Sequence, residues 1–188
     1  MADYTSENLD AKPYFNIEMF LHLSQETRID GALMDRAATL WEKWLNHLTV
    51  KKLKVGKIQY LAVWLDEEVE KDCDDAWDDS PSDAYMINNL AQAFVMSSIY
   101  SILPDVETAG CAPAPKPTDS LVDAMEAEGC PYNNNASALT RRYAVLTFYP
   151  FKGACDICYL QPDCPKGNGQ DEGGSMTIPG FEADAPQQ

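Results

Sequence analysis

The spacing of apolar residues changes along the first third of the chain. Between residues 15 and 24 apolar and polar positions alternate, which predicts a half-buried strand, although the same residues would also suit the start of a helix. Over residues 30–48 apolar residues return every three or four positions behind Asp30, a residue type that caps helices. We therefore expect an amphipathic helix over 30–48.

Four further segments carry clear patterns. The nearly continuous apolar run at 58–65 predicts a buried strand. A serine–proline pair opens a second long helix, expected over 81–103, because proline suits the first turn. A short helix is expected over 120–128 and a strand over 142–149, which is rich in β-branched and aromatic residues.

These elements predict an α+β fold, in which a small mixed sheet packs on two long helices and is followed by a cysteine-rich, metal-binding C-terminal extension. We divide the chain into five parts along the sequence. They are a flexible arm (1–13), the α+β core (14–103), a proline-rich connector (104–119), a cysteine cluster segment that includes a core strand (120–166), and a disordered tail (167–188).

Charge is the most unusual property of the composition. The 188 residues include 30 acidic and 14 basic side chains, giving a formal net charge of −16. Such a chain is repelled by nucleic acid and by anionic lipid, so we expect no direct binding to either and no membrane association. No run of apolar residues is long enough to span a membrane, and the first residues lack the features of a secretory signal. We therefore expect a cytoplasmic protein.

One third of the acids fall between residues 66 and 83. A block of like charges repels itself, so we expect a solvated loop or helix end that docks on a basic surface of a larger protein or complex. An alternative is a divalent cation held by the aspartates at 72–78, although the glycine and terminal glutamate of an EF-hand are missing. The proposed partner-binding residues are Asp66, Glu67, Glu68, Glu70, Asp72, Asp74, Asp75, Asp78 and Asp79.

Six cysteines form the chief chemical feature of the chain. Cys155, Cys158 and Cys164 stand in a C-x2-C-x5-C pattern, and Cys130 precedes them. In a reducing compartment such a group is more typical of metal ligands than of disulfides. We predict a metal centre held by Cys130, Cys155, Cys158 and Cys164. Cys73 lies in the acidic block and Cys111 in the connector, where Cys111 is the reserve candidate for the fourth ligand.

Three clustered cysteines with one remote cysteine favour a 4Fe-4S cluster over structural zinc, which usually shows two close pairs. Zinc, and thiols without metal, remain the alternatives. The pattern resembles that of the WhiB-like transcription factors and of the RecB-type nucleases with a four-cysteine cluster. The WhiB glycine–tryptophan turn and basic tail are missing here, and so is the Glu-x-Lys of the nucleases. The resemblance therefore implies the geometry of the cluster and neither activity.

Two functions remain in view. The first is a non-enzymatic accessory protein that docks on a basic surface, for example as a nucleic-acid-mimicking inhibitor, and is stapled by the four-cysteine centre. The alternative is an iron–sulfur electron-transfer protein or an accessory subunit of an oxidoreductase. No phosphate-binding loop, dinucleotide fingerprint or nucleophile–histidine pair is recognisable in the sequence.

Overall fold

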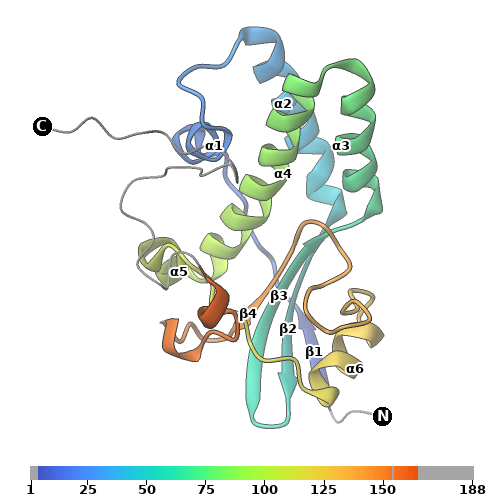
Figure 1. Cartoon of the computed structure of the whole chain (residues 1–188), viewed down its shortest axis with the longest axis vertical. Helices are drawn as coiled ribbons and strands as arrows, with labels where there is room; N and C mark the ends of the chain where they lie inside the picture. Colours follow the sequence, from blue (N-terminus) through green and yellow to red (C-terminus); the bar gives the residue numbers. More distant parts are fainter. Residues whose placement is uncertain (1–3, 154, 165–188) are drawn as a thin grey trace, which may run out of the picture.

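A computed structural model describes residues 4–153 and 155–164. Its sheet has four strands in the order β1 (Tyr4–Asn8), β2 (Leu48–Val55), β3 (Ile58–Leu65) and β4 (Ala144–Phe148) (Figure 1). Every neighbouring pair is antiparallel, so the prediction of a mixed sheet is wrong. The prediction of a loose N-terminal arm is also wrong for Tyr4–Asn8, because these residues pair with β2 from Val55 to Lys51.

Helices surround the sheet, and three of the six described α-helices lie where apolar periodicity predicts them. The structure confirms the long helices predicted over 30–48 and 81–103, the helix near 120–128, and the strands at 58–65 and 142–149. The helices are α1 (Ile17–Ser24), α2 (Gly31–Trp44), α3 (Glu67–Asp79), α4 (Pro81–Ile102), α5 (Pro104–Ala109) and α6 (Asp119–Ala127), with short 3₁₀ turns η1 (Leu45–His47), η2 (Cys155–Ile157) and η3 (Gln161–Asp163).

The segment predicted as a first strand is helix α1. The Asn16 side chain accepts a hydrogen bond from the amide of Met19 at 3.1 Å and caps the helix, and Gln25 ends it with a φ of 54°. Phe20 and Ser24, which are four residues apart, are the buried positions. The alternation of apolar residues is compatible with a strand and with a helix. The capping residues at the two ends favour the helix.

The acidic block also forms a helix, α3, where a solvated loop or helix end was expected. Val69, Cys73 and Ala76 recur at helical spacing and are fully buried. Asp66 caps the first turn by accepting from the amide of Glu68 at 3.0 Å. Because a helix N-terminus carries partial positive charge, the acids of the first turn stabilise the helix.

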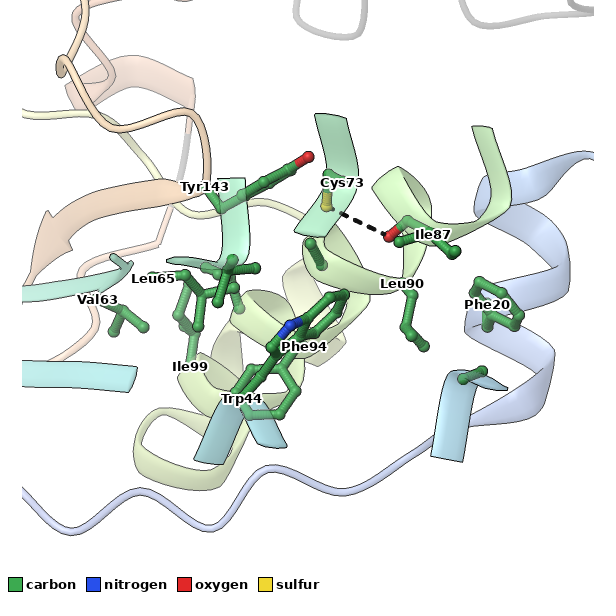
Figure 2. Close-up of a cluster of buried hydrophobic side chains, with 14 of the residues drawn as sticks. Phe20, Trp44, Val63, Leu65, Cys73, Ile87, Leu90, Phe94, Ile99 and Tyr143 are labelled. Atoms are coloured by element: carbon green, nitrogen blue, oxygen red, sulfur yellow. Dashed lines mark hydrogen bonds between the residues drawn. The ribbon is translucent and has the colours of Figure 1, made fainter. Parts of the chain in front are cut away.

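The sheet separates two hydrophobic clusters. The larger lies between the sheet and α2, α3 and α4, and includes Trp44, Leu65 and Phe94 (Figure 2). The smaller lies between the sheet and α6, and includes Leu53, Leu121 and Met125. Among the described residues no helix is both long and apolar enough to cross a membrane.

The proline-rich connector is only partly extended. Residues Pro104–Ala109 form α5, which ends at Gly110 with a φ of 65°. The chain then runs without helix or strand from Cys111 to α6, and the cysteine segment lies beside it (Figure 1). The disordered tail predicted for 167–188 lies outside the described residues.

Candidate metal centre

Four cysteines from two distant segments line one small cavity. Cys111 follows α5, whereas Cys155, Cys158 and Cys164 come from the segment after β4. The cavity has a volume of about 70 Å³, and its remaining lining residues are Ala109, Pro113 and Gln161. Three of the four cysteines predicted as ligands are therefore brought together, and Cys111 joins them.

The turns of the cysteine segment explain why its three cysteines face the same way. The amide of Cys158 donates to the carbonyl of Cys155 at 3.2 Å, and each third residue continues this pattern through Gln161 to Cys164. In such 3₁₀ turns, residues three positions apart lie on one side. The C-x2-C-x5-C spacing is a multiple of three throughout, so Cys155, Cys158, Gln161 and Cys164 all line the cavity.

Hydrogen bonds fix the connector between β4 and the cysteine segment. On one side, Thr147 Oγ1 donates to the carbonyl of Pro113 at 2.9 Å. On the other, the amide of Ala114 donates to Sγ of Cys158 at 3.4 Å, and the amide of Tyr159 donates to the carbonyl of Ala114 at 2.8 Å. These contacts position Cys111, three residues before Ala114, at the cavity.

Cys130 lies elsewhere. It is fully buried in the smaller hydrophobic cluster with Leu121 and Met125, and it does not line the cysteine cavity. Burial raises the pKa of its thiol to about 11, so the thiolate that binds metals is disfavoured there. Cys73 is buried in the larger cluster, where burial likewise raises its pKa to about 11.

The cavity offers a soft, sulfur-rich donor set. All six cysteines are present as thiols, and within residues 4–153 and 155–164 no three His, Cys, Asp or Glu side chains meet the geometry of a single metal-ion site. The space between the four cysteines would hold roughly five water molecules, since each needs about 10–15 Å³. Thiolates prefer zinc and iron–sulfur clusters among biological metals.

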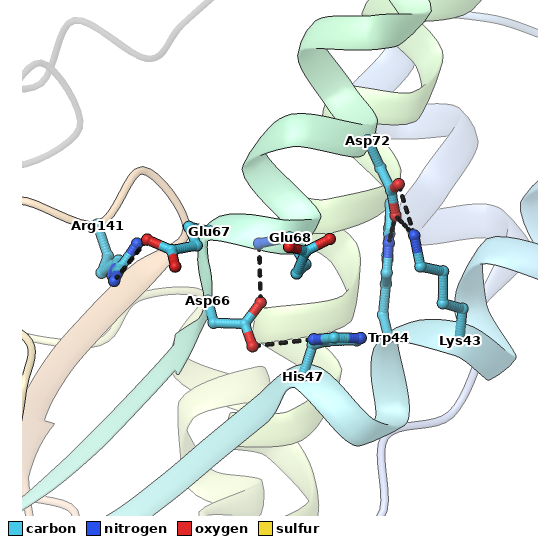
Figure 3. A network of polar contacts seen from close by, with 8 residues as sticks. All are labelled: Lys43, Trp44, His47, Asp66, Glu67, Glu68, Asp72 and Arg141. Atoms are coloured by element: carbon cyan, nitrogen blue, oxygen red, sulfur yellow. Dashed lines mark hydrogen bonds and ion pairs between the residues drawn. The ribbon is translucent and has the colours of Figure 1, made fainter.

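Many acids of the proposed docking surface form ion pairs or hydrogen bonds with other residues of the same chain (Figure 3). Asp72 accepts from Lys43 Nζ at 2.6 Å and from the indole nitrogen of buried Trp44 at 2.9 Å. Asp66 contacts His47 at 2.9 Å, and Arg141 lies 3.7 Å from Glu67.

Three further acids of the proposed surface contact arginines. Arg142 binds Asp74 through two nitrogens and lowers the pKa of that carboxyl group, and its backbone amide donates to Glu70. Asp79 lies 3.5 Å from Arg36.

The remaining acids, Glu68, Asp75 and Asp78, share one exposed face of the helix, which we call the α3 surface. Among the described residues no ion pair or side-chain hydrogen bond is found for the three carboxylates. Trp77 is 50% exposed, which is unusual for so large an apolar side chain. The sequence analysis did not single out Trp77. It follows buried Cys73 by one helical turn, so it flanks the buried stripe of α3 and does not share the face of Glu68 and Asp75.

Comparison of the chain with protein-family models, with curated proteins and with solved structures found no match.

Proposed function

We propose that this chain is a non-enzymatic accessory protein whose C-terminal segment is held by a four-thiolate metal centre. The observation that carries the proposal is the shared cavity of Cys111, Cys155, Cys158 and Cys164. Cys111 takes the place that the sequence analysis gave to Cys130. Four thiolates saturate a centre of this kind, so its role is to hold the connector and the cysteine segment together.

We favour a 4Fe-4S cluster over zinc on the pattern of the cysteines. Three clustered cysteines with a fourth that is remote in sequence are typical of such clusters, whereas structural zinc usually shows two close pairs. Zinc remains the alternative, and metal analysis separates the two.

The α3 surface supports the second part of the proposal, which is docking on a basic surface of a larger protein or complex. A chain of net charge −16 is attracted to basic surfaces, and among the described residues the three carboxylates of the α3 surface make no ion pair that would compete with a partner. A basic groove that takes nucleic acid is one such surface. Helix α3 runs beside the first part of α4, whereas the cysteine segment lies near the C-terminal end of α4 (Figure 1), and this separation supports distinct roles for them.

Electron transfer is the second candidate function. Cys155 is exposed, so a centre at this cavity would lie close to solvent, as electron exchange with a partner requires. A reversible one-electron couple in the purified protein would favour this function. A centre that is redox-inert over the physiological range would favour the purely structural role.

Metal analysis of the full chain, purified without oxygen, tests the first part. We expect about four iron and four sulfide per chain with a broad visible absorption. One zinc per chain without colour would support the alternative metal. A colourless protein that holds neither metal, and that cannot be reconstituted with iron and sulfide, would overturn the metal centre.

A pair of charge-matched variants tests docking, with polylysine as the basic probe. One variant carries Glu68→Gln, Asp75→Asn and Asp78→Asn on the α3 surface. The control removes the same charge from exposed positions of α6 with Asp119→Asn, Asp123→Asn and Glu126→Gln.

We expect the α3 variant to bind polylysine several-fold more weakly than the control and with a smaller salt dependence. Equal binding by the two variants would contradict docking through α3.

A further inference from the structure

Among the residues that the structure describes, strand β4 pairs with β3 along one edge and has no strand along the other. It is the last strand of the sheet, and the register with β3 pairs Val63 with Val145 and Leu61 with Thr147. The amide of Leu65 donates to the carbonyl of Tyr143 at 3.0 Å, so the odd-numbered residues of β4 make the ladder bonds to β3. The backbone groups of Ala144, Leu146 and Phe148 therefore point away from the sheet.

The connector runs beside this edge without pairing to it. Proline occupies positions 113, 115 and 117, and proline has no amide hydrogen to donate to a ladder. In the described part of the chain no hydrogen bond to the outward backbone groups of Ala144 or Leu146 is found. The side chain of Thr147 makes the hydrogen bond to Pro113, so the connector is held near β4 but not as a fifth strand.

A cavity of about 370 Å³ lies between β4 and the connector. Such a volume lies within the range of ligand-binding pockets. Ala144, Val145 and Leu146 form one wall and Pro115 and Pro117 another. The half-exposed Tyr159 and Leu160 also line it.

The charge of the cavity is concentrated at one end. Arg141 and Arg142 line it and lie just before Ala144 in the sequence. Arg142 is bound by Asp74. Among the described residues, the Arg141 guanidinium makes one ion pair, the long contact of 3.7 Å to the exposed Glu67. Arg141 is therefore the side chain with capacity to bind a further carboxylate.

We propose that this cavity binds the C-terminal end of an extended peptide, which adds to the edge of β4 as an antiparallel strand. Backbone groups of the peptide pair with Ala144 and Leu146, and alternate apolar side chains enter the cavity. An antiparallel partner ends at the Ala144 side, so its terminal carboxylate meets Arg141. This site is separate from the cysteine cavity and from the α3 surface, and the proposal goes beyond the function proposed above.

The first test titrates the isotope-labelled full chain with acetyl-Val-Thr-Val-Thr-Val, which carries a free carboxylate. We expect the amide resonances of Ala144 and Leu146 to shift on binding. Two N-methylated forms provide the control, one methylated on the valines and one on the threonines. Because successive amides of a strand point in opposite directions, only one form should lose binding, by tenfold or more.

Two variants of the protein complete the test. Ala144→Pro removes an outward amide without removing a ladder bond to β3, and we expect at least tenfold weaker binding, whereas Ala144→Ser should bind as the native chain does. Replacing the terminal carboxylate of the peptide by an amide should weaken binding severalfold in the native chain and not in Arg141→Gln.

If Ala144→Pro does not fold, the two methylated peptides still test strand addition on the native chain. Equal binding of both methylated forms, or no binding of the parent peptide, would overturn the proposal and leave the connector as a cover of the sheet edge.

Discussion

The backbone amide of Ala114 donates a hydrogen bond to Sγ of Cys158 over 3.4 Å, joining residues that are 44 positions apart in the chain. The amide of the next residue, Tyr159, donates to the carbonyl of Ala114, so both backbone groups of Ala114 bind the cysteine segment. Hydrogen bonds to a ligand sulfur stabilise the more negative, reduced state of an iron–sulfur cluster. The contact therefore links the folding of the connector to the properties of the proposed centre.

Ala114→Pro removes this donor, and we expect the reduction potential of the centre to become more negative. The visible absorption should also bleach faster in air, since a stabilising contact to the sulfur is lost. Potentiometric titration of the native and variant proteins measures the shift. Lys116→Pro, at an exposed position of the same connector, is the control. A shift of equal size in the control would show that general distortion of the connector, and not the lost amide, is responsible.

Removal of the metal should loosen only part of the molecule. Four thiolates hold residues 111–117 and 155–164 together in the proposed centre, while α2 and α4 pack in the larger hydrophobic cluster. Hydrogen exchange of the apoprotein should therefore rise in these two segments and stay slow in the middle of α4. Loss of protection throughout α4 would mean that the centre supports the whole fold.

Asp72→Ala should destabilise the protein by about 2 kcal/mol. The carboxylate accepts from the indole nitrogen of Trp44, which is fully buried, and its removal leaves that donor without a partner. Chemical denaturation measures the change. Asp75→Ala, on the exposed side of the same helix, is the control and should change the stability by less than about 0.5 kcal/mol. Similar losses in both variants would contradict a specific role for the Asp72–Trp44 contact.

Glu128 should make the protein sensitive to acid. Burial alone would raise the pKa of its carboxyl group, but the combined contacts with Lys51, Tyr4 and Ser6 outweigh burial and lower it. A carboxyl group with a lowered pKa in the folded state stabilises the fold well above its ordinary value of 4.5, and this stabilisation is lost as the pH falls through and below that value.

The melting temperature, measured from pH 7 to pH 3, should therefore fall more steeply for the native chain than for Glu128→Gln. Parallel curves would show that this ion pair contributes nothing to the pH dependence.

The sequence predicted the parts of the fold that local periodicity determines. Long helices and the β3 strand follow from apolar spacing over a dozen residues or from an uninterrupted apolar run. The prediction for helix α1 is wrong because its eight residues fit the two-residue period of a strand as well as the helical period. Only the capping residue Asn16 distinguishes the two. Helix α3 is not predicted because most of its residues are charged, and only the short stripe of Val69, Cys73 and Ala76 carries the helical spacing.

The part of the candidate site that depends on local spacing was likewise predictable, and the part that depends on tertiary structure was not. The spacing of Cys155, Cys158 and Cys164 is local, and successive 3₁₀ turns bring these residues to one side. The fourth cysteine depends on tertiary structure, because Thr147 of β4 holds the connector that carries Cys111. No local signal shows that α6 packs Cys130 into the smaller hydrophobic cluster.

The choice of Cys111 over Cys130 is the central claim of this account. The most direct measurement is the iron and sulfide content, with the visible spectrum, of Cys111→Ala and Cys130→Ala purified without oxygen beside the native chain. We predict that Cys111→Ala loses the cluster and that Cys130→Ala retains it in full. A metal-free native chain, a fully loaded Cys111→Ala, or loss of the cluster in a folded Cys130→Ala would contradict the account.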